Sequence, residues 1–312
     1  ENPPDGVVVT ANNRIAPAAY PHYLSDLYEP PYRAKRIRQL LAEKEHHGID
    51  DMVSIQLDVR SEWAKRLVAG ILAPLRESGI PLTTPAREAL DALLSWDGEA
   101  TPDSMPASIY YGFYLQLIGR LLKTLLGEDL FHGYFELLNA SVVPVENLLL
   151  SAESSFHGAK ERNELAARAL EDAVYELRRR FGEEPDRWRW GSQHALHLRH
   201  RLHELKPLRF VLSPGPFETG GDGTTVNNGQ FYFSNPFGHV LGAAYRQIFD
   251  LADWDTGRVV LAGGQSGNPL SPRYKDHVER WLNGAYFPLP FSRGAVERAK
   301  VGDAVTLSPA AP

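Results

Sequence analysis

The sequence contains no cysteine among its 312 residues. This excludes disulfide bonds, thiolate metal sites and cysteine nucleophiles, and it leaves the cellular compartment open. No apolar run reaches the ~20 residues that a membrane-spanning helix needs, so we expect no membrane span. An excess of basic charge is also lacking, because 39 acidic residues outnumber 33 basic ones and give a net charge of −6. Nucleic acid and anionic membranes are therefore not expected partners.

Several catalytic motifs are missing or incomplete. No H-E-x-x-H sequence occurs, although the chain has 11 histidines. The segment GGDGTTVNNG (220–229) lacks the lysine of a P-loop and the spacing of a dinucleotide fingerprint, and we interpret it as a tight connection in which Asp222 bonds to local backbone. Ser266 resembles a nucleophile elbow, but Asn268 replaces the last glycine of G-x-S-x-G and prolines follow at once. We expect no complete catalytic set within this chain.

The distribution of residue types divides the chain into three regions, which we interpret as parts of one intertwined domain. Residues 1–56 contain a short apolar run and a loop rich in proline and tyrosine. Residues 57–205 are predicted to be mainly helical, because apolar residues recur at helical spacing and several segments end in glycine. Residues 206–312 alternate short apolar runs with glycine, proline and asparagine, which is typical of strands. The predicted fold class is α+β.

Individual elements follow from the same patterns. Helical spacing predicts helices within 34–48, 50–79, 85–98, 108–127, 167–182 and 192–205. Short apolar runs predict strands at 208–212, 229–234, 243–251, 258–262 and 304–308. The helix at 192–205 carries four histidines, which we interpret as structural and not as metal ligands: His194, His197, His200 and His203.

The chain opens on GVVVTANNRI (6–15), an apolar β-branched run that ends in two amides and a cation. The run predicts a buried strand that joins the last strands in one sheet. An asparagine at the end of such a strand either bonds to backbone or points at a group that needs a neutral donor. Because side chains alternate along a strand, Asn12 and Asn13 should face opposite sides.

Nine stretches together resemble the penicillin amidase (penicillin acylase) family of N-terminal-nucleophile hydrolases. They are VVTANNRI, YEPPYRAKRIRQLL, DDMVSIQLDVRSEWAKRL, LLSWDG, WRWGSQHALHLRH, GGDGTTVNNG, AAYRQIFDLADWD, GGQSGNPLSPRYKD and WLNGAYFPLPFS. They occur in the family's order and cover nearly the whole chain. Two departures are small: Ala244 stands where the family often has serine, and Arg273 where it often has histidine.

The resemblance implies that this chain is the C-terminal part of the β chain of an αββα hydrolase. Such enzymes are cut autocatalytically from a precursor, and the new N-terminal serine attacks an amide with its own α-amine as base. That serine and the α chain would lie outside the present sequence, so we expect this chain alone to be inactive. The α chain and the N-terminal part of the β chain are the implied partners.

The resemblance also implies roles for three residues. Asn12 matches the family asparagine whose amide donates to the oxyanion of the tetrahedral intermediate. Arg33 matches an arginine that orients that asparagine and the α-amine. Asp26 matches a calcium ligand, and the site would be incomplete here because calcium takes about 6–8 oxygen ligands.

The substrate is left open by the sequence. The resemblance implies a linear N-acyl compound, such as a β-lactam with an amide side chain or an N-acyl homoserine lactone, and a periplasmic or secreted enzyme. Two alternatives are a non-catalytic structural fragment, and a carbohydrate- or peptide-binding β module that uses the aromatic residues of GQFYFSNPFGH (229–239).

Overall fold

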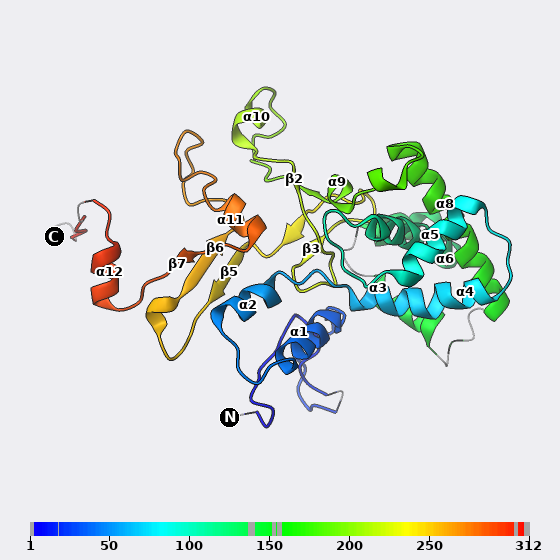
Figure 1. The fold of residues 1–312 in the computed structure, drawn as a ribbon, viewed down its shortest axis with the longest axis horizontal. Coiled ribbons are helices and arrows are strands. Elements are labelled where there is room, and N and C mark those ends of the chain that lie inside the picture. Colours follow the sequence, from blue (N-terminus) through cyan, green and yellow to red (C-terminus); the bar gives the residue numbers. More distant parts are fainter. Residues whose placement is uncertain are drawn as a thin grey trace. The chain divides into compact units, whose positions relative to one another are not determined.

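The computed structural model describes residues 3–17, 19–136, 141–151, 154, 158–302 and 305–308. Contacts within the chain group it into two compact units (Figure 1). The first comprises Glu1–His47 and Ser54–Ala243, and the second Gly48–Val53 and Ala244–Pro312. Helix α2 (Ile49–Gln56) is shared between them. Each unit is described by itself.

Helices make up most of the first unit. The π-helical turns η1 and η2 continue α3 and α7 respectively, and η3 is a 3₁₀ turn. None of the described helices combines the length and the hydrophobicity that crossing a membrane requires. The helical elements are α1 Tyr32–Ala42, α3 Glu62–Leu67, η1 Val68–Leu72, α4 Ala73–Glu77, α5 Thr84–Ser95, α6 Met105–Phe135, α7 Val142–Val145, η2 Glu146–Leu150, α8 Ala159–Phe181, η3 Pro185–Arg187, α9 Trp190–Gln193 and α10 Leu208–Leu212.

The core of the first unit forms where α5, α6 and α8 pack side by side (Figure 1). The two long helices pack closely at Gly112 of α6, where an added Cβ would lie 3.5 Å from the Cβ of Ala173 in α8, an ordinary van der Waals contact. Trp63, Tyr110 and Trp190 are among the largest side chains that are fully buried. This helical core supports the polar residues described below.

Strands in the first unit are short. β1 (Ala195–Leu196) pairs antiparallel with β2 (Phe217–Glu218), and β3 (Gly229–Gln230) with β4 (Leu241–Gly242). The glycine-rich segment 220–229 therefore connects β2 to β3, as the sequence indicated.

The second unit contains an antiparallel sheet of three strands in the order β5-β6-β7 (Figure 1). Arg246 of β5 is buried, stacks on the Trp281 ring at 4.4 Å and donates to the Trp281 carbonyl at 2.8 Å. The elements are β5 Tyr245–Ile248, the 3₁₀ turn η4 Trp254–Thr256, β6 Arg258–Leu261, α11 Val278–Asn283, β7 Phe287–Pro288 and α12 Arg293–Ala299.

The α+β class and most predicted helices are confirmed, as are strands β5 and β6. The predicted strand at 6–15 is wrong, because no described strand pairs with this segment and Val8 is 85% exposed. The run 208–212 forms helix α10 instead of a strand, which reflects how poorly a short apolar run separates the two structures. The run at 304–308 is not a strand over its described residues 305–308.

The predicted helix at 192–205 is also wrong beyond its first residues. Helix α9 ends at Gln193, and the chain turns into β1. In a continued helix the His194 carbonyl would accept a backbone N–H from the next turn. Here it accepts the backbone N–H and the hydroxyl of Thr219 instead. Tertiary hydrogen bonds therefore override a helical pattern of histidine and leucine.

Candidate functional site

Asn12 lies in a bend and has a backbone φ of +61°, the only positive φ of a non-glycine residue in the described part of the chain. Asparagine tolerates this left-handed conformation better than most residues because its short polar side chain bonds locally. The Asn12 carbonyl accepts the Glu29 backbone N–H at 2.9 Å, which ties the bend to the segment just before α1. The side chain itself is exposed.

Arg33 holds the oxygen of the Asn12 amide. It lies in the first turn of α1, and its Nη2 donates to Asn12 Oδ1 at 3.0 Å. Because a guanidinium group only donates hydrogen bonds, the amide must turn its oxygen toward Arg33. The amide nitrogen, with its two N–H donors, then lies on the other side. The two residues, 21 positions apart, thus form one unit with a fixed donor.

Asn13 uses its side chain differently. Its Oδ1 accepts the Ala11 backbone N–H at 3.1 Å, and its Nδ2 donates to the Arg14 carbonyl at 3.0 Å. Both amide atoms are therefore bonded to neighbouring backbone groups. Asn13 therefore stabilises the local backbone, whereas the side chain of Asn12 contacts another element, helix α1.

The charge of Arg33 is partly desolvated. Burial lowers the pKa of its guanidinium group, while the negative charges of Glu29 and Asp222 act in the opposite direction. Asp222 lies 189 positions further along the chain, in the glycine-rich connection between β2 and β3. This electrostatic partner links the Asn12–Arg33 pair to a second group of polar residues.

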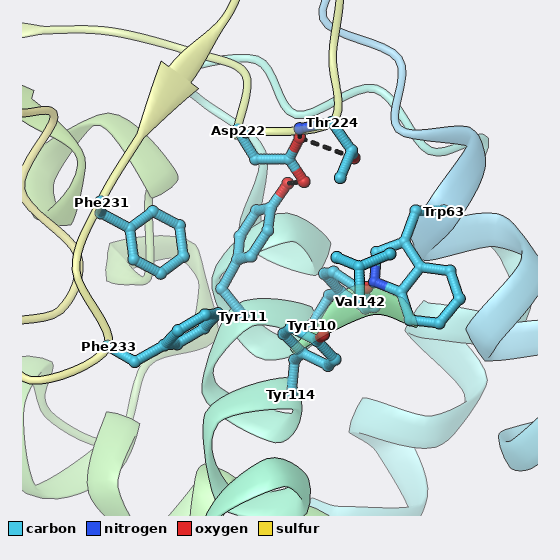
Figure 2. A pocket seen from close by; sticks show the side chains of 10 residues that line it. Trp63, Tyr110, Tyr111, Tyr114, Val142, Asp222, Thr224, Phe231 and Phe233 are labelled. Atoms are coloured by element: carbon cyan, nitrogen blue, oxygen red, sulfur yellow. Dashed lines mark hydrogen bonds between the residues drawn. The ribbon is translucent and has the colours of Figure 1, made fainter. Parts of the chain in front are cut away.

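Asp222 is a buried carboxylate with four hydrogen-bond donors around it. Figure 2 shows two of its partners, Tyr111 and Thr224. Its Oδ1 accepts the backbone N–H and the hydroxyl of Thr224 at 2.6 and 2.8 Å. Its Oδ2 accepts the Tyr111 hydroxyl at 2.8 Å and the Ser61 hydroxyl at 3.2 Å. Ser61 also caps the N-terminus of α3 by accepting the Ala64 N–H. Burial and the Asp222 charge raise the pKa of Tyr111 well above its ordinary value, so its hydroxyl remains a donor.

A small cavity lies beside Asp222 and is walled by aromatic rings of α3, α6 and the segment after β3 (Figure 2). The volume open to the centre of a water molecule is about 20 Å³, enough for about one water and too small for an acyl chain. Two polar atoms on its wall, Trp63 Nε1 and Tyr110 Oη, have no hydrogen-bond partner among the described residues. The cavity therefore suits a small polar molecule and does not suit an amide substrate.

Asp26 lies apart in the exposed loop before α1, where its Oδ1 accepts the Tyr23 hydroxyl at 3.3 Å. The described residues contain no cluster of three histidine or acidic side chains that could hold a metal ion. The chain thus offers calcium one carboxylate at this position, which does not satisfy the ~6–8 oxygen ligands of the ion. The residues present do not fit a calcium site by themselves.

Other residues singled out from the sequence have structural environments. Ser266 Oγ accepts the Asn268 N–H in a local turn. His194 is fully buried and its Nδ1 contacts the Phe237 carbonyl oxygen at 2.7 Å. Phe231, Phe233 and Phe237, which were considered as a binding surface, belong to the core of the first unit. The carbohydrate- or peptide-binding module is therefore not supported.

The environment of Asp222 was only partly predicted. Its bond to the nearby Thr224 N–H agrees with the expected local role. Its partners Ser61 and Tyr111 were missed, because they are 161 and 111 residues away in segments that show only helical periodicity. The one signal in the sequence is an acidic residue between glycines and threonines, in a segment that we expect to be a tight connection between strands.

The chain is similar to known proteins along nearly its whole length. The family model described as penicillin amidase matches residues 1–298. The chain is 29% identical to acyl-homoserine lactone acylase QuiP of Pseudomonas aeruginosa, over 99% of this chain and 40% of that protein. It is 32% identical to penicillin acylase 2 proenzyme of Pseudomonas sp. strain SE83, over 93% of this chain and 37% of that protein. The chain thus spans about two fifths of these curated relatives.

A solved structure shows the same fold. The thermostable penicillin G acylase from Alcaligenes faecalis superposes on all of this chain and on 58% of its own, with a TM-score of 0.64 and 16% sequence identity. The sequence match covers nearly every residue, and the likeness of fold extends over the entire chain. On these grounds the chain belongs to the penicillin amidase family.

Proposed function

We propose that this chain works as the C-terminal part of an acylase that cleaves a linear amide by acyl transfer to an N-terminal serine outside the present sequence. Membership in a family of amide hydrolases supports this proposal, as does the shared fold. The curated relatives are acylases more than twice as long as this chain, which is in keeping with a nucleophile supplied by a further segment. One of them is named a proenzyme, which favours activation by cleavage of a precursor.

Asn12 is the proposed oxyanion donor. The observation that supports this role is its hydrogen bond with Arg33. The contact fixes the amide oxygen and presents the amide nitrogen, so a neutral donor is preorganised before charge develops. A preorganised donor that meets charge only in the transition state lowers the barrier to reaction. In this proposal Arg33 orients the amide and does not itself bind the oxyanion.

The substrate class is proposed from the relatives. Penicillins and N-acyl homoserine lactones, named for the relatives, share an amide that joins an acyl chain to a ring-bearing amine. We propose that calcium, if bound, is held by Asp26 together with residues beyond this chain. We place the enzyme in the periplasm or outside the cell, with the α chain and the N-terminal part of the β chain as its partners.

The test uses the complete natural protein and a panel of amides. Penicillin G and N-acyl homoserine lactones of short and long chain are incubated with the wild-type enzyme and with Asn12→Ala, and the released amine is quantified. We expect hydrolysis of at least one class, with a loss of about two to three orders of magnitude in kcat for Asn12→Ala. Hydrolysis that Asn12→Ala leaves intact would contradict the proposed site. Turnover by the isolated 312-residue chain would contradict the proposed external nucleophile.

A further inference from the structure

The cavity beside Asp222 is lined entirely by buried residues. All ten of them are at most 9% exposed, so the cavity lies inside the first unit and not at its surface. Its volume of about 20 Å³ exceeds the ~10–15 Å³ that one water molecule needs. A cavity of this size stays dry when its wall is apolar, and it holds water when polar atoms on the wall need partners. The polar atoms therefore decide what the cavity contains.

Two polar atoms on the wall have no hydrogen-bond partner among the described residues. They are the hydroxyl oxygen of Tyr110 and the indole nitrogen of Trp63, in residues that are 0% and 1% exposed. A buried polar group without a hydrogen bond costs free energy, and folded proteins leave few of them. Figure 2 shows the Trp63 nitrogen turned toward the tyrosine rings of α6. Two such atoms on the wall of one cavity point to a bound partner.

Tyr114 lies on the same wall, one turn further along α6 than Tyr110. Its hydroxyl is hydrogen-bonded to the Ser141 hydroxyl, with 2.8 Å between the two oxygens. Burial raises the pKa of Tyr114, while this hydrogen bond and the N–H of Trp63 act in the opposite direction. The Trp63 N–H thus lies toward the hydroxyl groups of α6 without meeting the geometry of a hydrogen bond. A small molecule between them can complete that geometry.

Six aromatic rings and a carboxylate line the cavity, a combination that can also surround a small cation. Two features favour water. Each oxygen of Asp222 already accepts two hydrogen bonds, so its four lone-pair positions are in use. The indole N–H of Trp63 is only a donor, and it requires an acceptor, which a cation is not. Water can accept this N–H and still bond to the Tyr110 hydroxyl, which both donates and accepts.

We propose that one water molecule resides in this cavity and bridges Trp63 of α3 to Tyr110 of α6. The inference goes beyond the proposed function and does not depend on the catalytic site. Ser61, at the N-cap of α3, and Tyr111, next to Tyr110 on α6, both donate to Asp222 Oδ2. The two helices are therefore joined twice, once through the Asp222 carboxylate and once through the water.

The sign of the change in Tm for Tyr110→Phe in the complete protein tests this proposal. If water is bound, the variant removes one of its partners, and Tm should fall by about 2 °C or more. If the hydroxyl has no partner at all, its removal relieves an unsatisfied polar group, and Tm should stay unchanged or rise. Tyr114→Phe is the matched control, because it removes a direct hydrogen bond to Ser141 and should lower Tm in either case. An unchanged or higher Tm for Tyr110→Phe would overturn the inference.

A high-resolution crystal structure of the complete protein tests the site directly. We expect one peak of density about 2.7–3.2 Å from both Trp63 Nε1 and Tyr110 Oη. Tm should not depend on the concentration of potassium or ammonium at constant ionic strength, because a cation bound only to the folded state would raise it. A cavity without density, or a Tm that rises with either cation, would overturn the assignment of water.

Discussion

Arg33 Nη2 and Asn12 Oδ1 lie 3.0 Å apart and join a bend near the start of the chain to the first turn of α1. The contact fixes which end of the Asn12 amide faces Arg33, because a guanidinium group can only donate hydrogen bonds and so binds the amide oxygen. An exposed hydrogen bond of this kind contributes only about 1 kcal/mol to folding. Its consequences should therefore be seen in catalysis more than in stability.

Arg33→Ala should lower kcat of the complete enzyme by about tenfold or more, because the Asn12 amide loses the contact that fixes its orientation, and misplacement of a catalytic group is costly. Its Tm should change by little. Arg36→Ala is the matched control on the same face of α1. It breaks an ion pair whose side chains are 12% and 9% exposed. Arg36→Ala should lower the free energy of unfolding by more than the ~1 kcal/mol of a surface ion pair and by less than the ~3–5 kcal/mol of a fully buried one.

The outcome is read from kcat and from thermal unfolding of both variants. A loss of activity in Arg36→Ala as large as in Arg33→Ala would mean that the position of the helix matters and the contact with Asn12 does not.

Asn13→Ala should affect folding and leave catalysis alone. The substitution removes two local backbone hydrogen bonds, and a loss of about 0.5–2 kcal/mol is typical for a polar side chain that caps local backbone. Unfolding by denaturant and kcat of the complete enzyme are the measurements. Should Asn13→Ala abolish activity while Asn12→Ala is silent, the assignment of the oxyanion donor would be off by one residue.

His194 should make the protein sensitive to acid. Complete burial lowers the pKa of its imidazole from 6.5 to about 3 in the folded state. Below pH 6.5 the unfolded chain binds a proton that the folded chain excludes, so the free energy of unfolding falls by up to about 1.4 kcal/mol per pH unit until about pH 3. The stabilisation is fully present above pH 6.5.

The effect can be isolated by comparing Tm between pH 7 and pH 4 in the wild type and in His194→Gln. The variant should lose less stability on acidification, whatever its stability at pH 7. His46→Gln, at an exposed histidine, serves as the control. A decline in His194→Gln as steep as in the wild type would show that other groups cause the acid sensitivity.

Asp26→Ala should distinguish a calcium ligand from a loop acid. If Asp26 binds calcium with residues beyond this chain, the substitution should lower Tm of the complete protein by more in calcium than after chelation, because a ligand that binds only the folded state stabilises it. Its bond to Tyr23 would be lost under both conditions. Equal changes in Tm with and without calcium would assign Asp26 to the loop alone.

Periodicity predicted the helical part of the fold well. α5, α6 and α8 are amphipathic or buried over many turns, so their spacing determines them locally. β5 and β6 were predicted because β-branched and aromatic residues are concentrated there. The opening run at 6–15 and the run at 208–212 failed for one reason: whether a short apolar run becomes a strand depends on a partner that the run itself does not encode.

The residues of the candidate site were harder to predict from the sequence than the helices. Asn12 and Arg33 were identified through resemblance to a family, and the structure brings their side chains together. Their roles in catalysis remain predictions. Asp222 lies within the glycine-rich segment that the sequence predicts to be a connection between strands. Its partners Ser61 and Tyr111 depend on how α3 and α6 pack against this connection. Such long-range hydrogen bonds leave no periodic trace in the sequence.

The role proposed for Asn12, donation of its amide N–H to the oxyanion, can be measured through kcat of Asn12→Asp in the complete enzyme. The substitution keeps the shape of the side chain and the acceptor for Arg33, and replaces the N–H donors by a carboxylate oxygen. We predict a fall in kcat of about two to three orders of magnitude, with KM little changed and Tm maintained. A kcat within about threefold of the wild type, a difference of less than ~0.7 kcal/mol, would mean that Asn12 is not the oxyanion donor.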